Sequence, residues 1–260
     1  MNYFQNIGKI FIQSFSNFFF NVGKFSIFVY KTIKSAFSKK WYLKNLSQQF
    51  LEIGFYSLPV VTATAIFTGA VMALQTYAGC NRFGAESTVP TIVVLAITRE
   101  LAPILVGLMV AGRVSTSIAA HIGTMKVSEQ IDALYTLSTS PFKYLILPRV
   151  IATTVSMPFL VLLADIIGIF GGTVASVVSL KFDLSMYLNN TINFLRFEDV
   201  YSGIIKSIVF GFIIAISGCY CGYNSKGGAE GVGQATIKAI VSTSIGILLS
   251  NYLMTELFFI

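Results

Sequence analysis

Charged residues are scarce in this chain: only 11% of its residues are Asp, Glu, Lys or Arg. Soluble domains typically carry about 25% charged residues. Apolar residues make up 55% of the chain. This composition disfavours a soluble globular domain and predicts an all-α membrane protein.

Residues that commonly bind metals are also rare. His121 is the only histidine, and the three cysteines are Cys80, Cys219 and Cys221. An odd number of cysteines in apolar surroundings argues against a disulfide framework. One C-x-C pair with a single histidine is a poor zinc site. We therefore expect no metal site.

The sequence lacks the motifs of nucleotide-binding proteins and of common hydrolases. Gly-Lys occurs only at Gly8-Lys9 and Gly23-Lys24, and neither pair is followed by Ser or Thr, so there is no P-loop. Neither G-x-S-x-G nor H-E-x-x-H occurs. We expect no catalytic residues and no cofactor on this chain, so energy for any transport has to come from elsewhere.

Acidic residues are absent from the first 51 positions, which contain seven lysines. The rest of the chain holds eleven basic and eleven acidic residues, a balance of zero. A basic arm on a neutral membrane body predicts a cytoplasmic N-terminus near anionic lipid. Nucleic-acid binding is disfavoured because the arm is also apolar, and we expect no nucleic-acid partner.

Residues 1–48 form this basic arm, and their apolar side chains recur every three or four positions from Ile7 to Ile33. This spacing predicts an amphipathic helix that lies in the membrane interface. The same stripe also fits a helix packed on the rest of the protein, and the two arrangements are compatible.

Residues 49–260 contain five apolar stretches near the roughly 20 residues that a spanning helix needs. We predict spans at 53–78, 87–112, 150–178, 207–225 and 239–258. The long connections are 113–149 and 181–206. The first of these carries four bases and two acids, which places it in the cytoplasm with the N-terminus and puts the C-terminus outside.

The polar segment between spans two and three holds a predicted short helix at 126–138. Ile131 and Leu134 have helical spacing on its apolar face. Such a helix either covers the protein's own core or docks into a groove of a partner. The candidate docking residues are Glu129, Gln130, Asp132 and Leu134.

Span two and the segment after it contain the motifs R-E-L-x-P, A-G-R, I-G-T-M and E-Q-I-D-A-L, followed by S-P-F-K-Y-L-I-L-P-R and G-I-F-G-G. From about residue 50 to its end, the chain resembles the MlaE-type permeases. These are membrane subunits of ABC systems that move phospholipid between the two membranes of diderm bacteria and of chloroplasts. Three positions differ from the family pattern: Ser115 replaces Gly, His121 replaces Glu and Ser140 replaces Asp.

The resemblance implies partners and a location. It implies a homodimer in the inner membrane that maintains outer-membrane lipid asymmetry. MlaF-type ATPase subunits would bind ATP and Mg and contact the coupling helix at 126–138. A hexameric MCE-domain protein would sit on the outer side, and the resemblance allows for a STAS-domain protein on the ATPase.

Arg99 and Glu100 are charged residues inside span two. Neighbours on a helix point about 100° apart, so each needs a different partner. Charges inside a membrane are costly and usually face the protein interior or a wet cavity. By resemblance, Arg99, Glu100 and Lys206 line a lipid cavity. Leu74 and Tyr77 on span one either form its apolar wall or are ordinary lipid-facing side chains. The alternative for the charges is a buried network that ties spans two, four and five together.

Two other functions stay open at this point. An ion- or proton-coupled transporter would use Arg99, Glu100 and Asp165 as a relay, and a scaffold would only anchor partners. For Asp165 we expect a hydrogen bond to a neighbouring backbone or hydroxyl group. Gly168, Gly171 and Gly172 predict close helix packing.

Overall fold

The computed structural model describes residues 2–36 and 42–259, with side chains described from 19 to 36 and from 42 to 258. Most of these residues are helical, and none of them lies in a strand. The helices and turns are α1 (Asn2–Ala36), α2 (Leu43–Ile53), η1 (Phe55–Ser57), α3 (Leu58–Asn81), η2 (Glu86–Thr88), α4 (Val89–Ala96), η3 (Ile97–Leu101), α5 (Ala102–Val110), η4 (Ala111–Ser115), α6 (Thr116–Val127), α7 (Gln130–Thr136), η5 (Phe142–Ile146), α8 (Leu147–Leu180), α9 (Leu184–Phe194), α10 (Phe197–Tyr223) and α11 (Gly228–Phe259).

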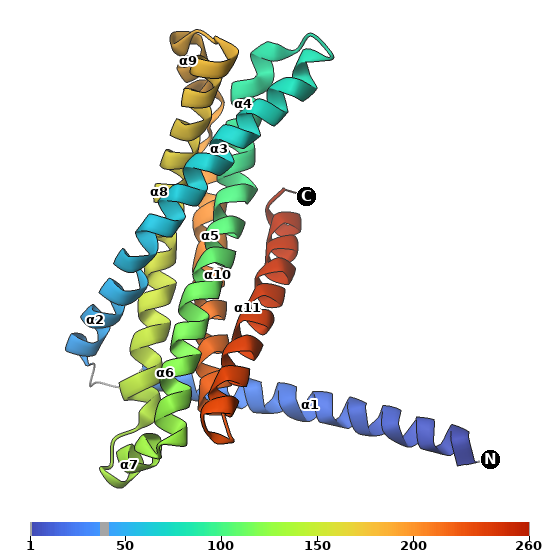
Figure 1. The fold of residues 1–260 in the computed structure, drawn as a ribbon, viewed down its shortest axis with the longest axis vertical. Coiled ribbons are helices and arrows are strands. Elements are labelled where there is room, and N and C mark those ends of the chain that lie inside the picture. The colour runs from blue at the N-terminus through green and yellow to red at the C-terminus, as the bar shows by residue number, and fades with distance from the viewer. Residues whose placement is uncertain (1, 37–41, 260) are drawn as a thin grey trace.

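The described residues form five helical runs that are long and apolar enough to cross a membrane, which confirms the expected all-α membrane fold. The runs are Leu43–Asn81, Glu86–Val127, Phe142–Leu180, Phe197–Tyr223 and Gly228–Phe258. They lie side by side as a bundle, with α7 at one end and α9 at the other (Figure 1). We call these two ends the α7 end and the α9 end.

The second run is longer than the sequence indicated. We placed its end near residue 112, but helix continues through α6 to Val127. Ile118 and Ile122 extend its apolar face and are buried, so the helix remains packed beyond the predicted span. The break comes at Glu129, whose left-handed φ of 59° ends the run before α7. The connection 181–206 is also partly helical, because it contains α9.

Two turns of the second run are π-helical. The first, η3, carries Arg99 and Glu100. The second, η4, carries Arg113. A π turn inserts one extra residue into an α-helix, and such turns are frequent at functional sites. Arg99, Glu100 and Arg113 are therefore candidates for functional residues.

Helices α3 and α8 cross at very close range. A methyl group added to Gly69 of α3 would overlap the carbonyl oxygen of Gly168 on α8, and one on Gly171 would overlap that of Ile66. Gly172 also faces the Gly69 carbonyl. The glycines of α8 thus allow two backbones to meet, as expected from their spacing.

The C-terminal part of α1 packs on the α7 end of the bundle. Phe28 is 5% exposed, and its ring centroid lies 5.3, 5.4 and 5.8 Å from those of Phe142, Tyr220 and Tyr223. From this contact α1 leads away from the bundle, crosswise to the spans (Figure 1). The packed arrangement therefore holds for this part of α1, and its place in a membrane interface stays a prediction.

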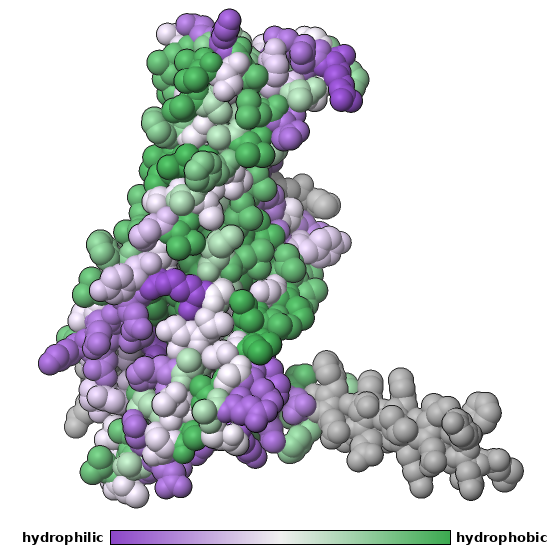
Figure 2. Space-filling view, viewed as in Figure 1, coloured by the Kyte–Doolittle hydropathy of each residue, from purple (hydrophilic) through white to green (hydrophobic). Residues whose placement is uncertain are grey.

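The hydropathy of the surface changes along the length of the bundle. Figure 2 shows apolar side chains over the middle of the visible face and hydrophilic side chains towards both ends. This distribution suits a protein whose middle lies in lipid and whose ends meet water.

Candidate functional site

Arg99 and Glu100 take different partners, as their adjacency predicted. Arg99 Nε lies 2.6 Å from Asp199 Oδ1, and the side chain of Asp199 is 1% exposed. Glu100 Oε1 lies 2.7 Å from the ammonium of Lys206, whose side chain is fully buried. The two ion pairs join η3 to the N-terminal part of α10, where Asp199 lies near the start of the helix and Lys206 lies further along it.

Lys206 donates hydrogen bonds to three acceptors on neighbouring helices. Its ammonium donates to the Arg99 carbonyl at 3.0 Å, to Glu100 Oε1 at 2.7 Å and to Thr255 Oγ1 at 2.8 Å. The first of these bonds follows from the sequence of span two. Pro103 has no N–H, so it leaves the carbonyl four residues earlier, that of Arg99, without its usual helical donor. Lys206 supplies that donor from a neighbouring helix.

Glu100 is held by α11 as well as by α10. Asn251 Nδ2 donates to Glu100 Oε2 at 3.0 Å, and the Thr255 hydroxyl donates to Oε1 at 2.8 Å. We call Arg99, Glu100, Asp199, Lys206, Asn251 and Thr255 the charge network. It ties spans two, four and five together, which is the structural alternative that we stated for these charges.

The charge network changes what Lys206 is expected to do. We expected Lys206 to line a lipid cavity, but its ammonium is buried and directed at protein acceptors. Arg99 and Glu100 differ, because their side chains are 36% and 35% exposed. These two residues remain reachable from outside the bundle, and their part in lipid binding stays a prediction.

Sequence reasoning missed three members of the charge network. Asp199 fell within the predicted connection 181–206, although acidic residues are typical of the first turn of a helix. Its Oδ2 accepts the Arg196 backbone N–H at 3.1 Å. Asn251 and Thr255 are four residues apart in an apolar helix and share one face. That spacing was the available signal for both.

The two expected apolar wall residues lie on α3. Leu74 is 40% exposed. Tyr77 is half-buried and packs edge-on against Phe182, with ring centroids 5.8 Å apart. Leu74 is therefore open to a lipid chain, whereas Tyr77 also serves the packing of the bundle.

Our expectation for Asp165 is wrong. The residue is 5% exposed, and neither carboxylate oxygen has a hydrogen-bond partner in the part of the chain that the structure describes. Arg99 and Glu100 are paired instead with Asp199 and Lys206. Among the described residues, Asp165 is thus not joined to Arg99 or Glu100 by a direct hydrogen bond.

The short helix α7 has one face that covers the protein's own core and other side chains that are exposed and available to a partner. Ile131 is fully buried and Leu134 is half-buried against the core, so one face covers the bundle. The opposite side exposes Glu129, Gln130 and Asp132. Asp132 accepts the Lys126 ammonium at 3.0 Å, which fixes α7 to the end of α6. Three of the four candidate docking residues are therefore exposed, and Leu134 is turned inward.

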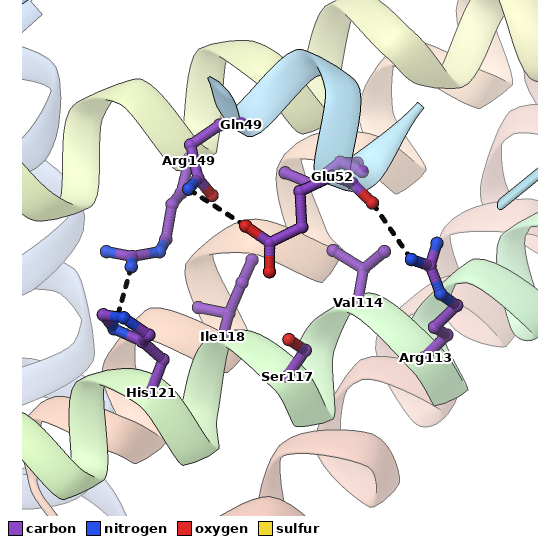
Figure 3. A pocket seen from close by; sticks show the side chains of 9 residues that line it. Gln49, Glu52, Arg113, Val114, Ser117, Ile118, His121 and Arg149 are labelled. Atoms are coloured by element: carbon purple, nitrogen blue, oxygen red, sulfur yellow. Dashed lines mark hydrogen bonds between the residues drawn. The ribbon is translucent and has the colours of Figure 1, made fainter. Parts of the chain in front are cut away.

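A second polar site lies towards the α7 end, between α2, α6 and the start of α8 (Figure 3). Arg149 is 6% exposed and donates to the Leu145 carbonyl at 2.8 Å, and its second terminal nitrogen lies 3.1 Å from His121 Nδ1. Arg113 donates to the Glu52 carbonyl at 3.0 Å. Sequence reasoning noted His121 and Arg113 separately and did not bring them together.

The fold and these charged groups within its spans define a multi-pass, all-helical membrane protein of the transport type. The chain belongs to the MlaE permease family: the family description "Permease MlaE" matches residues 46–257. It is a membrane permease subunit of the ABC type, and an ABC permease works with an ATPase partner.

Several relatives carry matching names. A probable ABC transporter permease of Rickettsia felis is 54% identical over 100% of this chain and 98% of its own length. One of Synechocystis sp. is 41% identical over 83% of this chain and 82% of its own. The Arabidopsis thaliana protein TRIGALACTOSYLDIACYLGLYCEROL 1, chloroplastic, is 36% identical over 85% of this chain and 63% of its own.

Proposed function

We propose that this permease moves phospholipid between the inner and outer membranes of a diderm cell and so maintains outer-membrane lipid asymmetry. The observation that carries the proposal is the pairing of partly exposed charges with an apolar surface. Arg99 and Glu100 are each about one-third exposed, while α3 and α11 expose large apolar side chains such as Leu74 and Leu253. A phospholipid matches both parts, because its head group is charged and its chains are apolar.

The name of one relative supports a lipid substrate. The Arabidopsis relative is named for a glycolipid, trigalactosyldiacylglycerol. A guanidinium such as that of Arg99 suits a phosphate group, because it offers several N–H donors in one plane. A small polar solute would not need the apolar surface that α3 and α11 expose.

The energy source and the orientation belong to the same proposal. The α7 end faces the cytoplasm of an inner-membrane protein, and MlaF-type ATPase subunits dock there through Glu129, Gln130 and Asp132. These subunits bind ATP and Mg, a STAS-domain protein binds to them, and this chain holds no cofactor and catalyses no reaction. Two copies of the permease pair at the centre, and an MCE-domain hexamer covers the α9 end.

Co-purification tests this proposal. The complex is isolated in mild detergent, and bound proteins and lipids are identified by mass spectrometry. We expect an ATPase subunit and phospholipid with the unaltered chain, and loss of the ATPase with Glu129→Ala. Glu86→Ala is the matched control, because Glu86 is an exposed acid at the opposite end. Phospholipid absent from every preparation, or an ATPase retained by Glu129→Ala, would contradict the proposal.

A further inference from the structure

The polar site towards the α7 end is a groove lined by polar and charged side chains. Two adjoining hollows of about 50 and 240 Å³ share Gln49, Glu52, His121 and Arg149 as lining residues. The larger has room for several waters at about 30 Å³ each. The groove is formed by three elements, α2, α6 and η5–α8. We call it the inner groove.

Two guanidinium groups line the inner groove, and both are fixed in place. Arg149 is held by the Leu145 carbonyl and His121, at 2.8 and 3.1 Å. Arg113 is held by the Glu52 carbonyl at 3.0 Å and by Ser57 Oγ at 2.6 Å. A guanidinium has five N–H donors, and these bonds use two of them in each residue. Both groups are thus preorganised and can donate further.

A single carboxylate accompanies these cations. Glu52 is exposed, and its Oε2 accepts a hydrogen bond from Gln49 at 3.3 Å. In Figure 3 its carboxylate lies between Arg149 and Arg113 and points into the hollow. The inner groove therefore presents positive charge on both sides of a negative group. This pattern complements a zwitterion that carries an anionic phosphate and a cationic amine.

The inner groove is connected to the charge network by one helical run. Arg113 and Arg99 lie 14 residues apart (99 to 113) on that run, and each is on a π turn. At 1.5 Å per residue the separation is about 21 Å, less than the roughly 30 Å of a hydrocarbon core. Helix α3 follows the groove-lining α2 along the chain and exposes five large apolar side chains: Val60, Ile66, Phe67, Val71 and Leu74.

We propose that the inner groove is a second head-group site, which binds a zwitterionic aminoalkyl phosphate at the α7 end. Arg149, which lines both hollows, takes the phosphate in the larger one, Glu52 takes the ammonium, and the acyl chains lie along α3. This inference rests on the proposed lipid transport and adds to it the point at which a lipid of the cytoplasmic leaflet meets the permease. Basic pockets between helices on this side of a membrane are known to hold lipid head groups.

Photo-crosslinking inside the complete complex tests the proposal. A photo-crosslinking amino acid replaces either Ser117, which lines the inner groove, or Leu74 on α3. The complex is reconstituted with its ATPase partner in vesicles that contain phosphatidylethanolamine and phosphatidylglycerol in equal amounts. We expect both positions to label phosphatidylethanolamine, and position 117 to prefer it over phosphatidylglycerol. Soluble phosphoethanolamine, added in a separate arm, shows whether the head group alone competes.

Glu52→Gln is the informative variant, because Glu52 is exposed and its loss leaves the bonds of Arg149 intact. We expect labelling of phosphatidylethanolamine at position 117 to fall about tenfold, the factor that one charge-assisted hydrogen bond supplies. Glu230→Gln, an exposed acid at the start of α11, is the matched control and should change nothing.

The outcomes separate the two proposals. Labelling at position 74 without labelling at position 117 overturns the inner groove and leaves lipid transport standing. Labelling at neither position overturns lipid transport itself. Equal labelling of both lipids at position 117, or no effect of Glu52→Gln, overturns the pairing of Glu52 with an amine. Labelling at position 117 that an excess of soluble phosphoethanolamine leaves unchanged would overturn recognition of the head group.

Discussion

Replacing Lys206 with methionine keeps the volume of the side chain and removes a fully buried positive charge. The Arg99 carbonyl then loses its donor, because Pro103 cannot supply one. Glu100 loses its counter-ion and keeps only the bonds from Asn251 and Thr255. The variant thus leaves a charge and a carbonyl poorly satisfied at the same place.

The expected cost of Lys206→Met follows from this geometry. Removing one partner of a buried ion pair typically costs about 3–5 kcal/mol. The lower figure applies here because the Glu100 side chain is 35% exposed and water can reach it. We expect the free energy of unfolding to fall by about 3 kcal/mol, which shifts the folding equilibrium roughly 150-fold.

Reversible unfolding in mixed detergent micelles, followed by circular dichroism, measures this change. Lys238→Met is the control, because Lys238 is exposed on α11, and its change should stay within about 0.5 kcal/mol. The double variant Lys206→Met with Glu100→Gln removes both charges, so its cost should be at least about 2 kcal/mol below the sum of the single costs. A Lys206→Met protein as stable as the parent, or strictly additive costs, would refute the reasoning.

Three further perturbations have defined outcomes. Gly69→Ala should separate α3 from α8 and cost at least about 2 kcal/mol in the same unfolding assay, whereas Gly79→Ala, which has open space around it, should not. Tyr135→Phe and Tyr223→Phe remove a hydroxyl pair that lies 3.0 Å apart, and a double-mutant cycle should give a coupling of about 1 kcal/mol; zero coupling would show that the contact contributes nothing. Phe28→Ala should cost about 3 kcal/mol and speed protease cleavage within α1, and unchanged cleavage would mean that α1 is held by other contacts.

The sequence predicted the parts of this structure that depend on the bilayer. Apolar length identified five spans, because every spanning helix must cross the same hydrocarbon thickness. It misplaced the end of the second run because Arg113 was interpreted as the start of the cytoplasmic connection 113–149. Charges end the part of a helix that lies in lipid, but they do not end the helix. Packing of Ile118 and Ile122 carries α6 beyond that point.

The candidate site was predictable only where it depends on local sequence. The adjacency of Arg99 and Glu100 required separate partners, and the structure has them. Which partners they take depends on how distant helices pack, and Lys206 lies 106 residues from Glu100. No local pattern contains that information. Asp165 shows the limit of a local rule, because a buried carboxylate was expected to find a hydrogen bond and has none among the described residues.

Lipid transfer between reconstituted vesicles tests the central claim most directly. A labelled phospholipid is followed with the permease alone, with its ATPase partner, and with the partner plus ATP and Mg, each with and without a proton gradient. The account predicts movement only when partner and ATP are both present, with no effect of the gradient. Transfer by the permease alone, driven by the gradient and abolished by Asp165→Asn, would contradict it and favour the coupled transporter.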